Sequence, residues 1–144
     1  MDIVVSANLK TASGGRLCDA RYTDAASYWF DATLGRTLWK RKDVNASIRV
    51  QALAGFYCWK NNDVVNRQND AFCYGAGVLG TYRGFSLDCN YAGFRGYRDN
   101  GDKPMILRTK LNYELKKNIL SFQYKHGMKD HLYDSYSLAY IRCF

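Results

Sequence analysis

A two-residue alternation of apolar and polar side chains is the feature that most constrains the fold of this chain. Successive side chains of a β-strand point to opposite faces of a sheet, so a period of two indicates strands. The alternation recurs in eight runs along the 144 residues, at 3–10, 28–38, 47–56, 72–82, 85–91, 105–115, 120–125 and 135–144. The pattern predicts one all-β domain, spanning residues 1–144, with eight antiparallel strands.

The strands that contain these runs are expected to extend beyond several of them and to be long, at about 9–14 residues each, whereas strands of soluble proteins average about 5–6. A strand that crosses a bilayer needs about 9–11 residues. A helical stripe over 107–122 competes with the strands there. We favour strands, because the alternation holds from Met105 to Glu114 and Lys117-Asn118 suits a tight turn.

The connections between the runs alternate in length. The longer ones cover residues 14–26, 61–70, 98–104 and 127–132, and the shorter ones cover 42–45, 83–84 and 117–118. In an up-and-down arrangement the odd connections lie at one end of the sheet and the even ones at the other. Long loops at one end and tight turns at the other are typical of outer-membrane barrels.

The placement of charge favours a barrel whose apolar side chains face outward. Six charged residues fall near the middle of the polar alternation, where they would form an interior network: Arg49, Asp88, Arg108, Lys110, Glu114 and Lys125. Charged and histidine residues on the apolar side are expected near strand ends, from which they can reach the interface: Arg36, Lys40, Arg95, His126 and Arg142. This is the inverse of a soluble barrel.

Aromatic residues are expected to gather near the ends of the strands that lead into the long connections. They are Tyr28, Phe30, Phe56, Phe72, Tyr74, Tyr97 and Tyr124. Aromatic rings of this kind border the apolar band of membrane proteins.

The chain ends in an alternating aromatic and apolar run, in which Tyr136, Leu138, Tyr140 and Phe144 share one face. In this the sequence resembles the small eight-stranded outer-membrane β-barrel proteins of bacteria, whose last strand typically ends in an aromatic residue that the barrel-assembly machinery reads. Arg142 and the five cysteines depart from that pattern. The resemblance implies an eight-stranded antiparallel up-and-down transmembrane β-barrel in a bacterial outer membrane. The N-terminus lacks the basic and apolar regions of a signal peptide, so we expect that such a signal has been removed.

A closed eight-stranded barrel has an interior that side chains just fill. We therefore expect no open pore, with room for long basic side chains provided by glycines at 35, 55, 75, 77 and 80. The expected role is structural, accessory or surface-binding, through the long loops. The expected partners are the lipid bilayer, the assembly machinery, an envelope complex and lipopolysaccharide, whose phosphates suit a net charge of +8. The alternative is a secreted, soluble lipocalin- or avidin-like barrel that binds a small hydrophobic ligand.

A second alternative is an enzyme, because some barrels of the resembled class hydrolyse acyl chains of lipid A. Those enzymes use a histidine and a serine two residues apart together with a carboxylate. Here His126 is followed by Met128 in place of the serine. His131 and Asp134 complete a weak candidate set, with a serine at 135 or 137 as nucleophile.

The remaining motifs predict no cofactor and no metal site. Gly75 to Gly80 spells a dinucleotide-binding pattern, but the alternation continues where a helix would be required. Asp99 to Asp102 lacks the rest of a calcium loop and is expected to form a turn. The five cysteines contain no Cys-x-x-Cys pair, although Cys58 and Cys73 could bridge a hairpin. The basic residues are spread over most runs, which disfavours nucleic-acid binding.

Overall fold

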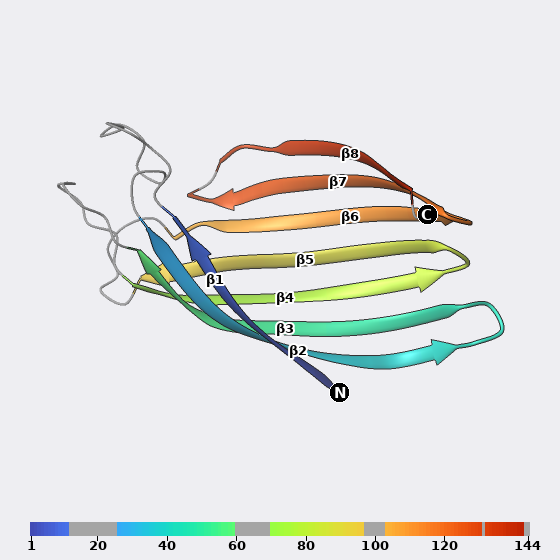
Figure 1. The fold of residues 1–144 in the computed structure, drawn as a ribbon, viewed down its shortest axis with the longest axis horizontal. Helices are drawn as coiled ribbons and strands as arrows, with labels where there is room; N and C mark the ends of the chain where they lie inside the picture. The colour runs from blue at the N-terminus through green and yellow to red at the C-terminus, as the bar shows by residue number, and fades with distance from the viewer. Residues whose placement is uncertain (12–25, 60–69, 97–102, 131, 143–144) are drawn as a thin grey trace.

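The computed structural model describes residues 1–11, 26–59, 70–96, 103–130 and 132–142. These residues form eight strands, shown in Figure 1. They are β1 (Asp2–Lys10), β2 (Ser27–Arg41), β3 (Ala46–Trp59), β4 (Ala71–Tyr82), β5 (Phe85–Gly96), β6 (Met105–Leu115), β7 (Asn118–Lys129) and β8 (Ser135–Arg142).

The strands form one sheet in which each strand pairs with its neighbours in the sequence, in the order β1 to β8, and every pair is antiparallel. The predicted all-β fold of eight antiparallel up-and-down strands is thus confirmed. The helix considered for 107–122 is wrong, because β6 and β7 pair across that segment. The sheet differs from the predicted barrel in one respect. Among the described residues β1 and β8 pair with one strand each, so the sheet is open.

The two edge strands, β1 and β8, lie at different levels along the sheet. One row of backbone partners crosses all eight strands: Asp2, Gly35, Gln51, Gly77, Asn90, Arg108, Lys125 and Ser135. Asp2 is the first residue of β1, and Ser135 is the first residue of β8. From this row β1 extends toward the end of the sheet opposite the tight turns, and β8 extends toward those turns.

The tight turns have the backbone conformation that hairpins require. Arg83 and Gly84 both have positive φ, at 45° and 87°, as the two central residues of a type I′ turn do. The turn between β6 and β7 is Lys116-Lys117, with φ of 57° at Lys116. The expected turn at Lys117-Asn118 is therefore wrong by one residue, and Asn118 begins β7.

A β-bulge in β2 changes which side chains face each side of the sheet. The register with β3 shifts between Thr37 and Trp39, so Leu38 is the additional residue. Beyond the bulge Trp39 pairs with Ile48, and Lys40 pairs with Ser47. A shift of one residue moves every later side chain to the other face. Lys40 therefore lies on the polar side, and its expected place on the apolar side is wrong.

Each face of the sheet has its own chemistry. The polar face is defined by residues such as Asp31, Gln51, Asn90, Arg108 and Lys125. The apolar face is defined by Ile3, Val5, Ala32, Leu34, Val50, Ala52, Ala76, Val78, Leu87, Leu107, Leu111, Phe122 and Leu138. Both sets follow from the strand register.

The described part of the chain has almost no hydrophobic core. Its buried apolar residues are Ala46 and Ala71, and no large side chain within it is fully buried. A soluble single sheet would have to cover one face with another layer. Here the described residues supply no second layer, so the apolar face stays uncovered (Figure 1).

The glycines were expected to leave room for long basic side chains, and one of them does so. A side chain at Gly35 would collide with the Arg49 guanidinium, which passes over it from the next strand. Gly80 instead lies on the apolar face, where nothing is close to it. Gly55 adjoins the backbone of Phe30, and a Cβ there would come within 2.6 Å of its carbonyl oxygen.

Some expected features lie outside the described residues. They are most of the connections at 14–26, 61–70 and 98–104, Tyr97, the Asp99–Asp102 motif, His131 and Phe144. No helix in the part of the chain that the structure describes is long and apolar enough to cross a membrane.

Candidate functional site

The apolar face extends across all eight strands of the sheet. Its side chains are highly exposed, including Ile3 at 60%, Val5 at 76% and Leu138 at 83%. Monomeric soluble proteins rarely expose apolar patches of more than a few hundred Å². This face therefore exposes apolar side chains from β1 to β8.

Aromatic rings border the apolar face at both ends of the sheet. At the connection end lie Tyr28, Phe30, Phe56, Phe72 and Tyr74, as expected, with ring centroids 5.9 Å apart for Tyr28–Phe30 and 6.3 Å for Phe72–Tyr74. At the turn end lie Trp39, Tyr82, Phe85, Tyr113 and Tyr140. The sequence reasoning missed this second border, although the residues next to the tight turns carry the signal. Phe85 and Tyr113 stack there at 4.4 Å.

Basic residues on the apolar face are mostly near strand ends. Arg95 lies one residue from the end of β5, and Arg142 is the last residue of β8. Arg36 is different, because it lies five residues before the end of β2 and pairs with Val50. The expectation that Arg36 lies at a strand end is therefore wrong.

The polar face carries two ion pairs. Arg49 Nη1 donates to Asp2 Oδ2 at 2.6 Å. Arg108 Nη2 donates to Asp88 Oδ2 at 3.3 Å, and Asn90 Nδ2 donates to the other carboxylate oxygen at 2.9 Å. Asp2 and Asn90 were missing from the expected network, because Asp2 is the first residue of its strand and Asn90 carries no charge.

The other expected members of the network share the polar face without an ion pair to a described residue. Lys110 is directly opposite Asp88 on the neighbouring strand, and Lys125 is opposite Arg108. Glu114 lies near the turn end of β6 and is exposed. The expected set therefore shares one face, while hydrogen bonds link only part of it.

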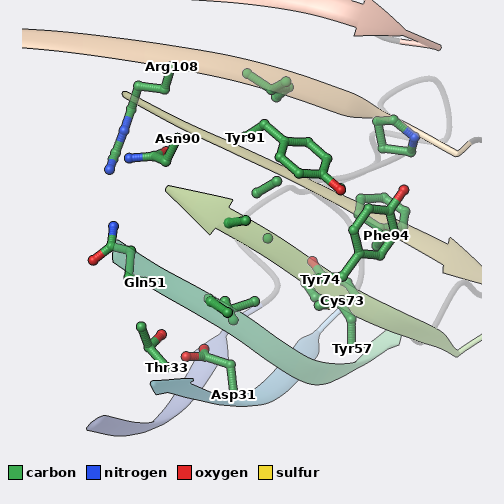
Figure 2. Close-up of a pocket in the computed structure, with 18 of the residues that line it drawn as sticks. Asp31, Thr33, Gln51, Tyr57, Cys73, Tyr74, Asn90, Tyr91, Phe94 and Arg108 are labelled. Atoms are coloured by element: carbon green, nitrogen blue, oxygen red, sulfur yellow. The ribbon is translucent and has the colours of Figure 1, made fainter. Parts of the chain in front are cut away.

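A cavity of about 610 Å³ opens on the polar face (Figure 2). Gln51, Asn90 and Arg108 lie toward one end of it, and Tyr57 and Phe94 lie toward the other. A volume of this size lies within the range of small-molecule sites, about 300–1,000 Å³.

The cysteines in the described segments are free thiols at positions 58, 73 and 89. Cys58 lies on the apolar face opposite Tyr28, whereas Cys73 lies on the polar face opposite Gly55. The considered bridge between Cys58 and Cys73 is therefore absent. No group of three potential metal ligands occurs within the described ranges.

The structure brings together two of the weak catalytic candidates. His126 Nδ1 lies 2.8 Å from Asp134 Oδ1, and Tyr124 OH donates to Asp134 Oδ2 at 2.8 Å. The hydrogen bond with His126, with a second from Tyr124, lowers the pKa of Asp134 below its usual value. The serines at 135 and 137 cannot serve His126, because their strand positions place them on the polar face.

The terminal strand carries its expected signal residues on the apolar face. Tyr136, Leu138 and Tyr140 of β8 are all highly exposed. Tyr136 stacks on Tyr124 of β7 at 4.9 Å. These side chains form a regular row at the free edge of the sheet.

No protein-family model matches this sequence, and searches of curated proteins and of solved structures return no match.

We expect Asp88→Asn to lower the free energy of unfolding by about 1–3 kcal/mol, because Arg108 would lose its charged acceptor in a half-buried position. Lys125→Gln is the matched control. It removes a like charge opposite Arg108 and should leave stability unchanged or raise it slightly. Urea titration of both variants in the same detergent measures the difference. Equal losses in the two variants would contradict the assigned ion pair.

Proposed function

We propose that this protein is an integral protein of a bacterial outer membrane, and that its apolar face contacts the hydrocarbon of the bilayer. The observation that carries the proposal is an apolar face exposed from β1 to β8, opposite a face that holds the ion pairs. Burial of apolar surface contributes about 25 cal/mol per Å². A sheet with almost no core of its own would gain that contribution from lipid.

The two aromatic borders support this placement. Tyr74 and Tyr82 are eight residues apart on β4, which corresponds to ~26 Å along the strand at ~3.3 Å per residue. A strand tilt of about 40° reduces this to a height of ~20 Å. The apolar band of outer-membrane barrels is about 25 Å tall and has an aromatic girdle at each interface. The spacing of the borders is compatible with such a band.

We further propose that β1 pairs with β8 to close a barrel in the membrane. In lipid, the unpaired N–H and C=O groups of two open edges would each cost several kcal/mol, which closure avoids. For eight strands about 4.8 Å apart, a tilt of 35–45° requires a total stagger of about 8–12 residues around the barrel. The stagger must be even, because an odd value would place apolar side chains inside.

The levels of the edge strands fit this requirement. Asp2 and Ser135 lie in one row, with β1 extending to one side of it and β8 to the other. A stagger of eight brings Ser135 level with Lys10, and a stagger of ten brings Ser137 level with Lys10. Both registers pair most of the two edges and keep Leu138 and Tyr140 on the apolar face.

Within the membrane we assign the protein a structural, accessory or surface-binding role, exerted through its longer connections and not through an open pore. Lipid, lipopolysaccharide phosphates, the barrel-assembly machinery and an envelope complex are the partners that suit a basic chain with this terminal strand. The narrow interior of an eight-stranded barrel, which has room for side chains or one small ligand, supports the absence of a continuous channel.

We expect Val50→Arg to block membrane assembly and Gln51→Arg to be tolerated. The two residues are adjacent on β3 but face opposite sides, and an arginine facing the bilayer midplane costs about 2–4 kcal/mol. Urea-resistant membrane association of the two variants in a Gram-negative host, compared with the parent, measures the effect. Equal tolerance would contradict the orientation. A parent that purifies as a monomer without detergent would favour the soluble, ligand-binding alternative.

Closure predicts disulfides across the edges in a background without native cysteines. The pairs Ala7→Cys with Leu138→Cys and Leu9→Cys with Leu138→Cys correspond to staggers of eight and ten, and one of them should form an intramolecular disulfide. The pair Ile3→Cys with Leu138→Cys corresponds to a stagger of four, which is too small for this barrel, and serves as the control. Gel mobility without reductant, before and after membrane assembly, measures the cross-link. A disulfide only in the control, none at all, or only dimers between chains would refute closure of the chain on itself.

The contact between His126 and Asp134 favours a second candidate, a hydrolase that acts on acyl esters of lipid A. A carboxylate-oriented histidine on the apolar face could activate water for attack on an ester. In that case purified protein would release fatty acid from vesicles that contain lipid A, and His126→Ala would reduce release at least 100-fold. Absence of release by the parent protein, or equal release by the variant, would eliminate the hydrolase.

A further inference from the structure

The cavity on the polar face has two chemically different ends. One end is aromatic, because Trp29, Tyr57 and Phe94 form a nearly parallel stack with centroids 5.3 Å and 5.8 Å apart. The other end is polar, with Gln51, Asn90 and Arg108 directed toward the same space (Figure 2). Tyr57 and Gln51 are six residues apart on β3, which corresponds to ~20 Å along the strand. The cavity is therefore elongated as well as amphipathic.

The two ends of the cavity also differ in charge. Its charged lining residues are Arg108 and Lys125 near the polar end and Asp31 next to the aromatic end. The nearby acid, Asp88, already accepts hydrogen bonds from Arg108 and Asn90 on its two oxygens. An anionic group would be attracted to the polar end and repelled from the aromatic end.

Arg108 retains a donor for such a group. Its Nη2 binds Asp88, but its Nε is buried and has no hydrogen-bond partner among the described residues. A buried donor without an acceptor costs about 1–3 kcal/mol. The Arg108 side chain as a whole is 41% exposed, so a carboxylate in the cavity can approach the guanidinium and accept from it.

The middle of the cavity is shaped by small side chains. Gly75 and Ala92 face each other on β4 and β5, and Cys73 lies next to them on the side of the aromatic stack. A Cβ at Gly75 would come within 2.9 Å of the Tyr91 carbonyl oxygen, so larger residues do not fit there. The passage between the two ends is therefore open and mostly apolar.

We propose that this cavity binds an elongated amphipathic anion, with its ring-bearing apolar body against Trp29, Tyr57 and Phe94 and its terminal carboxylate at Arg108. This site goes beyond the proposed membrane role and does not depend on it, since β2 to β7 supply its lining. An eight-stranded barrel can hold one small ligand, so closure of the sheet is compatible with the site.

Protection of Cys73 tests the site directly. In a variant that keeps only this cysteine, 4-(1-pyrenyl)butyrate should slow alkylation of Cys73 by N-ethylmaleimide at least fivefold, as measured by intact mass. The neutral 4-(1-pyrenyl)butanol has the same ring, and its half-protecting concentration should be at least tenfold higher than that of the acid. Equal protection by the acid and the alcohol would overturn the assigned carboxylate site. No protection by either probe would overturn the cavity as a ligand site.

Matched charge variants separate specific binding from general attraction. Arg108→Met should raise the half-protecting concentration of the acid at least tenfold, whereas Lys110→Met should change it less than twofold. Lys110 lies two residues away on β6, has the same charge and does not line the cavity. Equal effects of the two variants would refute the role of Arg108. Arg108→Lys guards against misfolding, because it retains the charge and should restore part of the protection if the sheet is intact.

Discussion

The main-chain hydrogen bonds between neighbouring strands are the interaction on which this structure depends. In the described residues only two small alanines form a buried apolar core, so side-chain packing cannot hold the sheet together. Seven antiparallel pairs supply the order of the strands, the register and the separation of an apolar from a polar face. Such a sheet is stable where its apolar face is removed from water and its main-chain groups remain paired. A bilayer provides the first condition, and closure of the edges would provide the second.

Much of the fold could be predicted from the alternation, because the physical signal is local. The polarity of neighbouring side chains such as Val50 and Gln51 is enough to predict that they face opposite sides of the sheet. The dipeptide Arg83-Gly84 is enough to predict a turn. The bulge at Leu38 could not be predicted, because nothing in the residue types of the run marks Leu38 as the additional residue. The bulge nevertheless reverses the faces of Trp39 and Lys40. The turn at Lys116 was placed one residue too late for a different reason: Asn118 is a residue that favours turns, but here it begins β7.

The candidate sites were less accessible to sequence reasoning, because they depend on contacts between strands. Arg49 was expected in the interior, but its partner Asp2 is 47 positions away and lies two strands along the sheet. The link between His126 and Asp134 requires the approach to β8 to fold back beside β7. The cavity arises where glycine and alanine of neighbouring strands share a row, which a pattern read along one strand does not reveal.

The order of the strands also has a kinetic consequence. Every pairing in the sheet joins segments that follow one another along the chain, so each hairpin can form by closing only the connection between its own two strands. The proposed pairing of β1 with β8 would be the single pairing between segments that are far apart in the sequence. It could not form until the last strand was available. Loop-closure entropy would then be concentrated in that final step, making it the slow stage at which a chaperone or insertion factor could control the outcome.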